Sequence, residues 1–136
     1  MGTNEDIMHE FVRRELKRLF PAVDGWQVKS LPRTPEGAAF VVSRRFLGRT
    51  EGAHVLVTFG RKVTGESART LREIAAGSPI GGVPTPRLVV MAPQGADAAD
   101  LPGDVELIPM KSFGYEGETL VWLRRRSRER ARVPAA

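Results

Sequence analysis

The 136-residue chain contains no cysteine, which excludes disulfide bonds and thiolate metal sites and is typical of a protein from a reducing cytoplasm. It also lacks any apolar run near the roughly 20 residues that a membrane-spanning helix needs. Its polar N-terminus, MGTNEDIMHE, does not have the pattern of a signal peptide. We therefore expect a cytoplasmic protein without a membrane partner. With 41% hydrophobic residues, a chain of this length can bury a core without a disulfide or a metal.

Acidic residues are missing from the two segments that look most like strands. Asp and Glu are absent from residues 38–46 and from residues 53–65. These segments contain the apolar runs at residues 40–46 (FVVSRRF) and 54–62 (HVLVTFGRK), joined by a short link that contains glycine. Two such runs close together predict a β-hairpin. In the second run both alternating sets of side chains are largely apolar, which predicts a central strand covered on both faces.

The excess positive charge is confined to one short segment. The formal net charge is +5, and residues 124–132 (RRRSRERAR) carry six arginines and one glutamate, so they account for all of it. We divide the chain into one α/β domain over residues 1–123 and a basic C-terminal tail over residues 124–136. An Arg-rich tail contacts phosphates without reading sequence; the alternative is the solvated, frayed end of a helix.

The other elements follow from periodicity and from the positions of proline and glycine. Helical spacing of apolar residues and the stop at Pro21 predict a first helix. The remaining predictions are an edge strand at 26–30, a second helix at 64–77 capped by Gly77, a mobile loop at 78–86, a buried strand at 87–92, a helical turn at 97–101, a parallel last strand at 105–109 ended by Pro109, and a terminal helix from 119, for which a strand is the alternative.

The resulting order is helix, strand, hairpin, helix, strand, strand and C-terminal helix, in a single three-layer-like domain with a central mixed sheet. This order resembles the PD-(D/E)xK nuclease superfamily, the restriction-endonuclease-like fold, above all its small Mrr-like and archaeal resolvase-like members. The matching text is FVVSRR, HVLVTFGRK, SARTLREIAAG, RLVVMAP and VELIPM, within residues 6–110. The match is one of topology and hydrophobicity, without a signature motif.

The resemblance implies a metal site on the hairpin, and this chain lacks its residues. In the family, an Asp on the first hairpin strand and a Glu or Asp on the second bind a divalent metal, and a Lys two residues later assists phosphodiester cleavage. On this chain these positions fall at or near Phe40, Thr58 and Gly60. A shift of two or four residues brings no carboxylate onto the second strand. We therefore expect a vestigial site, no catalytic residue and no cofactor.

Two functions stay open. The first is a non-catalytic nuclease-like domain for binding or assembly, which includes weak, sequence-independent nucleic-acid contact and homodimerisation. Its candidate contact residues are basic: Arg44, Arg45, Arg49, Arg61, Lys62, Arg124, Arg125, Arg126 and Arg128. The second is a Mg²⁺-dependent nuclease with a relocated carboxylate site. That site would use acids that are otherwise solvated or capping residues: Glu10, Glu15, Glu36, Glu51 and Glu66.

The remaining polar residues give no catalytic signal. His9 and His54 are far apart in sequence and have no ligand-like neighbours, and at a strand start His54 is expected to be exposed or hydrogen-bonded. Ser43 and Ser67 lack a base and a nucleophile elbow. The pair of glycines at residues 81–82 lacks the spacing of a phosphate-binding loop. A hydrolase triad and a nucleotide loop therefore have no support.

Overall fold

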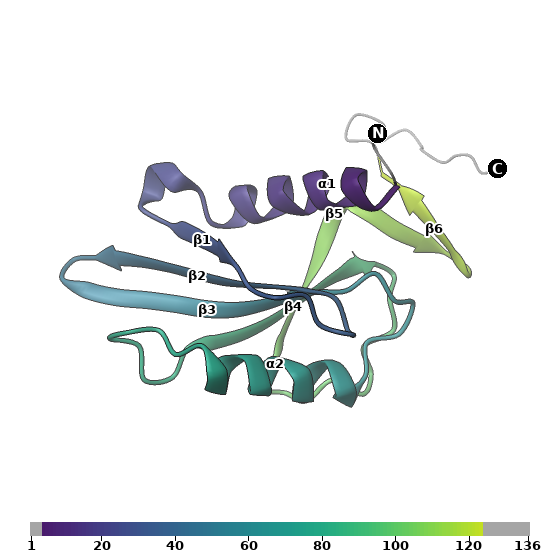
Figure 1. Cartoon of the computed structure of the whole chain (residues 1–136). Helices are drawn as coiled ribbons and strands as arrows, with labels where there is room; N and C mark the ends of the chain where they lie inside the picture. The colour runs from purple at the N-terminus through teal and green to yellow at the C-terminus, as the bar shows by residue number, and fades with distance from the viewer. Residues whose placement is uncertain (1–3, 124–136) are drawn as a thin grey trace.

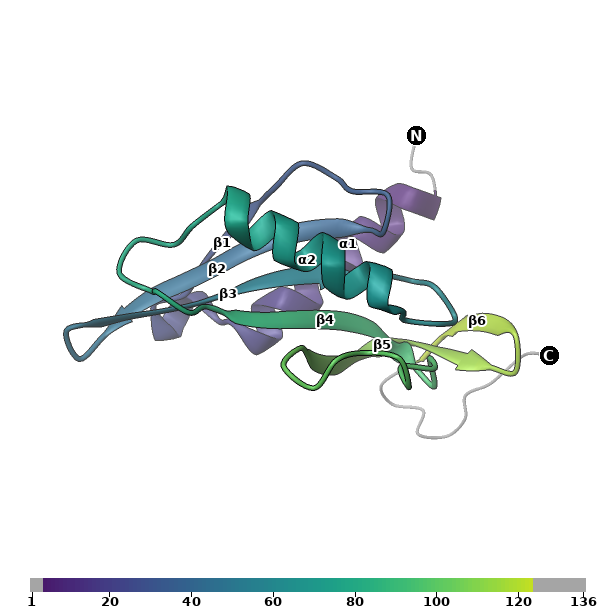
Figure 2. The same ribbon diagram turned by 90° about the horizontal axis from the view of Figure 1, so that it is seen from below.

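Six strands form one mixed sheet in the order β1-β2-β3-β4-β5-β6, with one helix on each face (Figures 1 and 2). The computed structural model describes residues 4–123, with side chains from His9 onward. The elements are α1 (Asn4–Leu19), a 3-10 turn (Ala22–Asp24), β1 (Gln27–Ser30), β2 (Ala38–Phe46), β3 (Arg49–Val57), α2 (Gly65–Gly77), β4 (Arg87–Gln94), β5 (Glu106–Glu116) and β6 (Thr119–Trp122). The predicted mixed α/β sheet is confirmed, and it curls into a half-barrel.

Two hydrophobic cores flank the sheet. Val12 and Leu16 on α1 and Phe20 directly after it recur at a spacing of four residues and pack against one face. Leu71 and its neighbours on α2 pack against the other face. Fully burying one such side chain contributes roughly 1.5–3 kcal/mol. Because both alternating sets of β3 side chains are buried, the prediction of a central strand covered on both faces is confirmed. No helix within residues 4–123 is long and apolar enough to cross a membrane.

The β2–β3 hairpin has a much tighter turn than the sequence predicts. Phe46 pairs with Arg49, so only Leu47 and Gly48 form the turn. Both have positive φ, 54° and 78°, which is the pattern of a type I′ turn. The predicted link at residues 47–53 is therefore wrong, because most of it belongs to β3. The strand also ends at Val57, so the second half of the predicted run leaves the sheet.

The chain then makes a parallel crossover through α2. The Thr64 side chain accepts a hydrogen bond from the Glu66 amide and caps the start of α2. The helix ends at Gly77, with Ser78 and not Gly77 as its C-cap. β4 pairs in parallel with β3, and it also pairs in parallel with β5, as predicted. Between β4 and β5 the predicted helical turn is a short hydrogen-bonded turn in which the Leu101 amide donates to the Ala98 carbonyl at 3.1 Å.

The C-terminal part of the sheet differs from the prediction. Pro109 does not end β5, because it sits opposite Ala92 at a bulge, after which Gln94 pairs with Gly114. The predicted terminal helix is wrong: residues 119–122 form β6, antiparallel to β5. The arginines that favoured a helix begin at residue 124, outside the described residues. The strand is favoured instead by the Gly117 turn, with φ of 65°, and by aromatic packing of its last residue.

Candidate functional site

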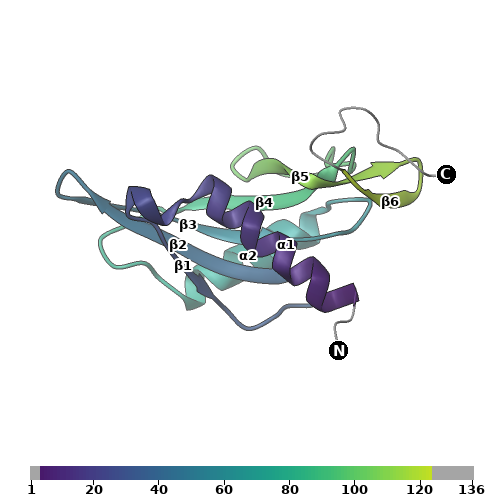
Figure 3. The same cartoon turned by 90° about the horizontal axis from the view of Figure 1, so that it is seen from above.

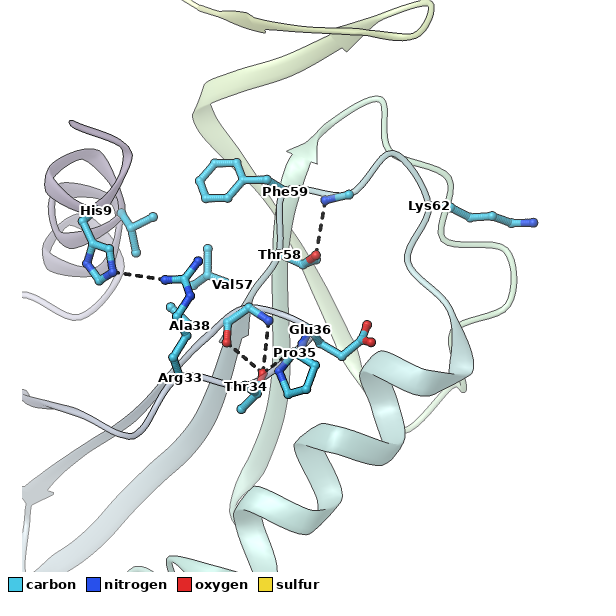
Figure 4. A pocket seen from close by; sticks show the side chains of 13 residues that line it. His9, Arg33, Thr34, Pro35, Glu36, Ala38, Val57, Thr58, Phe59 and Lys62 are labelled. Carbon is cyan, nitrogen blue, oxygen red and sulfur yellow. Dashed lines mark hydrogen bonds between the residues drawn. The ribbon is translucent and has the colours of Figure 1, made fainter. Parts of the chain in front are cut away.

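An open pocket of about 530 Å³ lies where β2 begins and β3 ends. His9 and Val12 on α1 form one wall, and the loop between β1 and β2, residues 33–37, forms a second. The third wall is the segment that follows β3, from residue 57 to Lys62 (Figure 4). The pocket thus lies at the carboxyl end of β3, where the chain leaves the sheet between the antiparallel partner β2 and the parallel partner β4.

Two of the three vestigial positions reach this pocket. Thr58 and Gly60 line it, and the Thr58 hydroxyl accepts a hydrogen bond from the Gly60 amide at 3.3 Å. The Thr58 amide donates to the Met91 carbonyl at 3.0 Å, which ties the end of β3 to β4. Phe40 is instead 3% exposed and belongs to the core under α1. Just after the end of β3, Thr58 thus places a hydroxyl group where the resemblance implies a carboxylate.

The loop between β1 and β2 is held by a small hydrogen-bond network. The Thr34 hydroxyl donates to the Gly37 carbonyl at 2.8 Å and accepts from the amides of Glu36 and Gly37. Gly37 has φ of 149°, and a Cβ there would lie 2.1 Å from the Val57 carbonyl oxygen. Only glycine fits this close approach. The network fixes where the side chains on either side of Thr34 leave the loop.

The charged groups of the pocket come from both faces of the sheet. Arg33 Nη1 lies 3.4 Å from His9 Nε2; since arginine can only donate, Nε2 is the acceptor. On the other side, Ser67 Oγ donates to Glu36 Oε1 at 3.1 Å. Lys62 is exposed and extends away from His9 (Figure 4). Among the lining residues Glu36 is the single carboxylate, against the cations Arg33 and Lys62.

Two of the predicted basic contact residues are used by the fold. Arg61 donates to the carbonyls of Gly117 at 2.8 Å and Gly95 at 3.0 Å, and its guanidinium lies over the Tyr115 ring. It thereby fastens the turn after β4 and the turn between β5 and β6 to the segment that follows β3. The fold thus occupies this guanidinium, and a nucleic-acid contact by Arg61 stays a prediction.

Arg44 is engaged in the same way. It donates to Glu51 at 3.1 Å and to the Asp24 carbonyl at 3.3 Å, and it stacks on Trp26 and Phe46. Arg45 and Arg49 differ: both are exposed, and within residues 9–123 neither side chain has a hydrogen bond or an ion pair. The other predicted contacts, Arg124, Arg125, Arg126 and Arg128, lie outside the described residues.

The carboxylates that a relocated metal site would need are dispersed. Glu51 lies in β3, not in a link, and pairs with Arg44. Glu66 pairs with Arg69 at 2.6 Å, and Glu10 is exposed on α1. Within the part of the chain that the structure describes, no group of three or more His, Asp or Glu side chains gathers as metal ligands would.

Glu15 is buried, and the prediction of a solvated or capping residue is wrong. It is 2% exposed, and its Oε2 accepts from the β5 amides of Lys111 at 2.9 Å and Ser112 at 2.7 Å. Arg18 donates to Oε1 at 2.7 Å. Burial opposes ionisation, but these hydrogen bonds from Arg18, Ser112 and Lys111 outweigh it and hold the pKa of Glu15 below its ordinary value.

His54 is fully buried in the middle of β3, away from the pocket. Its Nε2 lies 2.6 Å from the Ser78 carbonyl and donates to it, while Nδ1 has no partner among the described residues. Ile80 approaches Gly52 so closely that a Cβ there would lie 2.7 Å from Ile80 Cδ1. The loop after α2, predicted to be mobile, is thus packed against β3 at both points.

No protein-family model matches the chain, and neither a curated protein nor a solved structure matches it. The chemistry of the pocket is that of an anion site: a guanidinium, an ammonium and hydroxyls are the usual partners of a phosphate. A divalent cation prefers several oxygen ligands, and the pocket offers one carboxylate. Sequence reasoning missed Arg33 and Thr34; the available signal was the LPRTPEG loop, whose prolines place these residues directly before the hairpin.

Proposed function

We propose that this protein is a non-catalytic binding domain with a nuclease-like order of elements, and that its pocket receives a phosphate of a nucleic-acid backbone. The observation that carries the proposal is the composition of the pocket, which is lined by two cations, Arg33 and Lys62, and a single carboxylate, Glu36. That carboxylate already accepts a hydrogen bond from Ser67. Phosphate contacts of this kind position a nucleic acid without reading its sequence.

The arrangement of elements supports the nuclease-like part of the proposal. A helix, three antiparallel strands, a helix and a parallel strand follow one another, which is the order implied by the resemblance to the PD-(D/E)xK superfamily. The pocket adjoins Thr58 and Gly60, the positions at which that family would carry its second acid and its lysine. A binding surface at a former active site would keep the location and lose the carboxylates. Homodimerisation stays a prediction.

The test is a titration of a fluorescently labelled 30-bp DNA with the full chain, followed by anisotropy at several salt concentrations. We expect Arg33→Gln and Lys62→Gln each to weaken binding about 3- to 10-fold and to lower the salt slope by about one ion. The matched control is Arg87→Gln, which removes the same charge at the start of β4, where Arg87 pairs with exposed Glu106. Equal effects of all three substitutions would mean that binding depends on the net charge of the protein and not on the pocket, and would overturn the proposal.

One observation favours the alternative of a metal-dependent nuclease: Glu36 does reach the pocket. Calorimetric titration with Mg²⁺ and Mn²⁺, together with a plasmid-cleavage assay, separates the two functions. We expect no stoichiometric metal binding and no cleavage by the full chain. Stoichiometric binding that disappears in Glu36→Gln, but persists in an exposed control such as Glu73→Gln, would reverse the order of the two candidates.

A further inference from the structure

The tip of the β2–β3 hairpin is the most exposed apolar point of the sheet. The hairpin reaches past both helices in three views (Figures 1–3). Leu47 stands at its apex with 83% of its surface exposed. It also has φ of 54°, a left-handed backbone conformation that β-turns of this type normally give to Asn, Asp or Gly.

The fold gains little from leucine at this position. At 83% exposure the side chain buries almost nothing, while its backbone is strained. Asn-Gly at the same two positions would form the turn without this conflict. Residues held in sparsely populated backbone conformations cluster at functional sites. An exposed leucine in a strained turn therefore points to a contact outside the chain.

Two arginines flank the apex on opposite faces of the ribbon. Phe46 pairs with Arg49 and Arg45 pairs with Thr50. Cross-strand partners share a face and successive residues alternate, so Arg49 lies on the face of Phe46 and Arg45 on the other. Within residues 9–123 no acidic side chain pairs with either of them, whereas Arg44 is offset by Glu51. The tip therefore presents a cation on each side of an apolar apex.

We propose that this tip docks in the major groove of double-stranded DNA, with Leu47 against the base edges and Arg45 and Arg49 on the two flanking phosphate backbones. The inference rests on the proposed function, because it names duplex DNA as the nucleic acid that the domain contacts. The major groove, about 12 Å wide, admits a two-stranded β-ribbon, whereas the minor groove is about half as wide.

The chemistry of the tip fits this occupant better than a lipid surface. Cations on both faces of a ribbon match phosphates on both sides of a groove. An apolar apex can contact the methyl group of thymine. Membrane insertion would need a broader apolar surface, and here Phe46, the apolar neighbour of Leu47, lies under the Arg44 guanidinium.

The experiment compares Leu47→Asn with Val23→Asn, a control that removes a side chain of 91% exposure from the turn after α1. Leu47→Asn relieves the turn, so we expect its thermal midpoint to rise by about 3–5 °C. We also expect its affinity for a 20-bp duplex to fall at least 5-fold, with affinity for a single strand of the same length unchanged. A more stable protein that binds less well cannot owe the loss to unfolding.

The arginines are tested by the double variant Arg45→Gln/Arg49→Gln against Arg69→Gln/Arg87→Gln, which removes the same charge from pairs with Glu66 and Glu106. We expect a loss of about 10-fold in duplex affinity and a salt slope lower by about two ions for the tip variant. The control should keep more than half of the affinity.

The outcomes separate this inference from the proposed function. If the tip variants bind the duplex like the parent chain while Arg33→Gln is weakened, the tip inference is overturned and the pocket stands. If only the tip variants are weakened, the tip stands and the pocket assignment falls. Equal losses in Leu47→Asn and Val23→Asn overturn the tip inference. The tip inference is also overturned if the parent chain has no affinity for the duplex but binds phosphatidylserine vesicles, and Leu47→Asn does not bind these vesicles. That result would assign the tip to a membrane.

Discussion

Replacing Glu15 by glutamine should destabilise the protein strongly without changing any exposed surface. The carboxylate lies between α1 and a bulge in β5, where the pairing with β4 jumps from Ala92–Pro109 to Gln94–Gly114. The bulge takes the amides of Lys111 and Ser112 out of the strand ladder, and both donate to Glu15 Oε2, at 2.9 and 2.7 Å. Glu15 thus supplies these two amides with the hydrogen-bond acceptor that a neighbouring strand would otherwise provide.

The expected cost follows from the hydrogen bonds. A bond to a charged group contributes about 1.5–3 kcal/mol and a neutral one about 0.5–1.5 kcal/mol. Glutamine keeps one acceptor oxygen for the two amides but loses the charge in each bond and turns an amide group toward Arg18. We estimate a loss of about 2–3 kcal/mol for Glu15→Gln. Glu15→Ala leaves two buried amides without a partner, each costing about 1–3 kcal/mol, and should lose about 3–5 kcal/mol.

The same geometry predicts a pH dependence with a definite sign. Because hydrogen bonding holds the pKa of Glu15 below its ordinary value near 4.5, the folded state favours the ionised carboxyl. This stabilisation is complete above pH 5 and is lost as the pH falls through 4.5 toward the pKa of the folded state. Glu15→Gln removes the titrating group, so its stability should depend less on pH between 5 and 3 than that of the parent chain.

The measurement is urea unfolding followed by circular dichroism at pH 7, 5, 4 and 3. The control is Glu10→Gln, an exposed acid on the same helix, which should change stability by less than about 0.5 kcal/mol. A midpoint for Glu15→Gln equal to that of Glu10→Gln at pH 7 would refute the account. So would an unfolding free energy that falls with pH as steeply in Glu15→Gln as in the parent chain.

Three further substitutions test the site. Gly37→Ala should cost about 3 kcal/mol or more, measured by thermal unfolding, because its Cβ would meet β3 backbone at 2.1 Å; a loss under 1 kcal/mol contradicts this. Arg61→Gln should lower the free energy of unfolding by about 1–2 kcal/mol but weaken DNA binding no more than Arg87→Gln; a larger loss of affinity would show that Arg61 contacts the DNA. His54→Leu leaves the Ser78 carbonyl unpaired, costs about 1–2 kcal/mol and should speed proteolysis of the loop after α2; unchanged cleavage would contradict it.

The hairpin was predictable, but its turn was not. Alternating β-branched residues identify both strands, since that signal is local. Residues 49–52 are polar or glycine and look like a loop. They are strand because of partners elsewhere: Glu51 pairs with Arg44 across the hairpin, and Gly52 has no Cβ to meet Ile80. Cross-strand and loop contacts of this kind leave no periodic mark in the segment itself.

The errors near the C-terminus have the same origin. Proline removes one amide from a strand, so Pro109 predicts an end. The bulge tolerates it because Gln94 Nε2 donates to the Met110 carbonyl at 3.0 Å and Glu15, almost a hundred residues earlier in the chain, accepts from the next amides. β6 is fixed by Trp122, whose ring centre lies 4.5 Å from that of Phe11. Phe11 and Trp122 lie near opposite ends of the chain, so no local pattern in the sequence predicts their contact.

The pocket was half predictable for a different reason. The resemblance places Thr58 and Gly60 on the second hairpin strand, but β3 ends at Val57, so both lie just after the strand, where they line the pocket. Phe40 fell in the core because the pairing of Phe40 with Val55 directs it under α1. The loop with Arg33 and Thr34 was overlooked because a search for acids passes over basic residues and hydroxyls.

Pocket and tip lie at opposite ends of one hairpin, which decides whether one straight duplex can touch both. From Ala38 to Phe46 the strand rises about 26 Å, at roughly 3.3 Å per residue. The major groove is only about 8.5 Å deep, so a tip that enters it holds the pocket clear of that duplex. We therefore expect the pocket to contact a second nucleic-acid segment, and a short duplex of 14 bp to saturate the chain at two copies. In Arg33→Gln or Leu47→Asn the stoichiometry should fall to one, and a stoichiometry of one in the parent chain would mean that pocket and tip do not both bind nucleic acid.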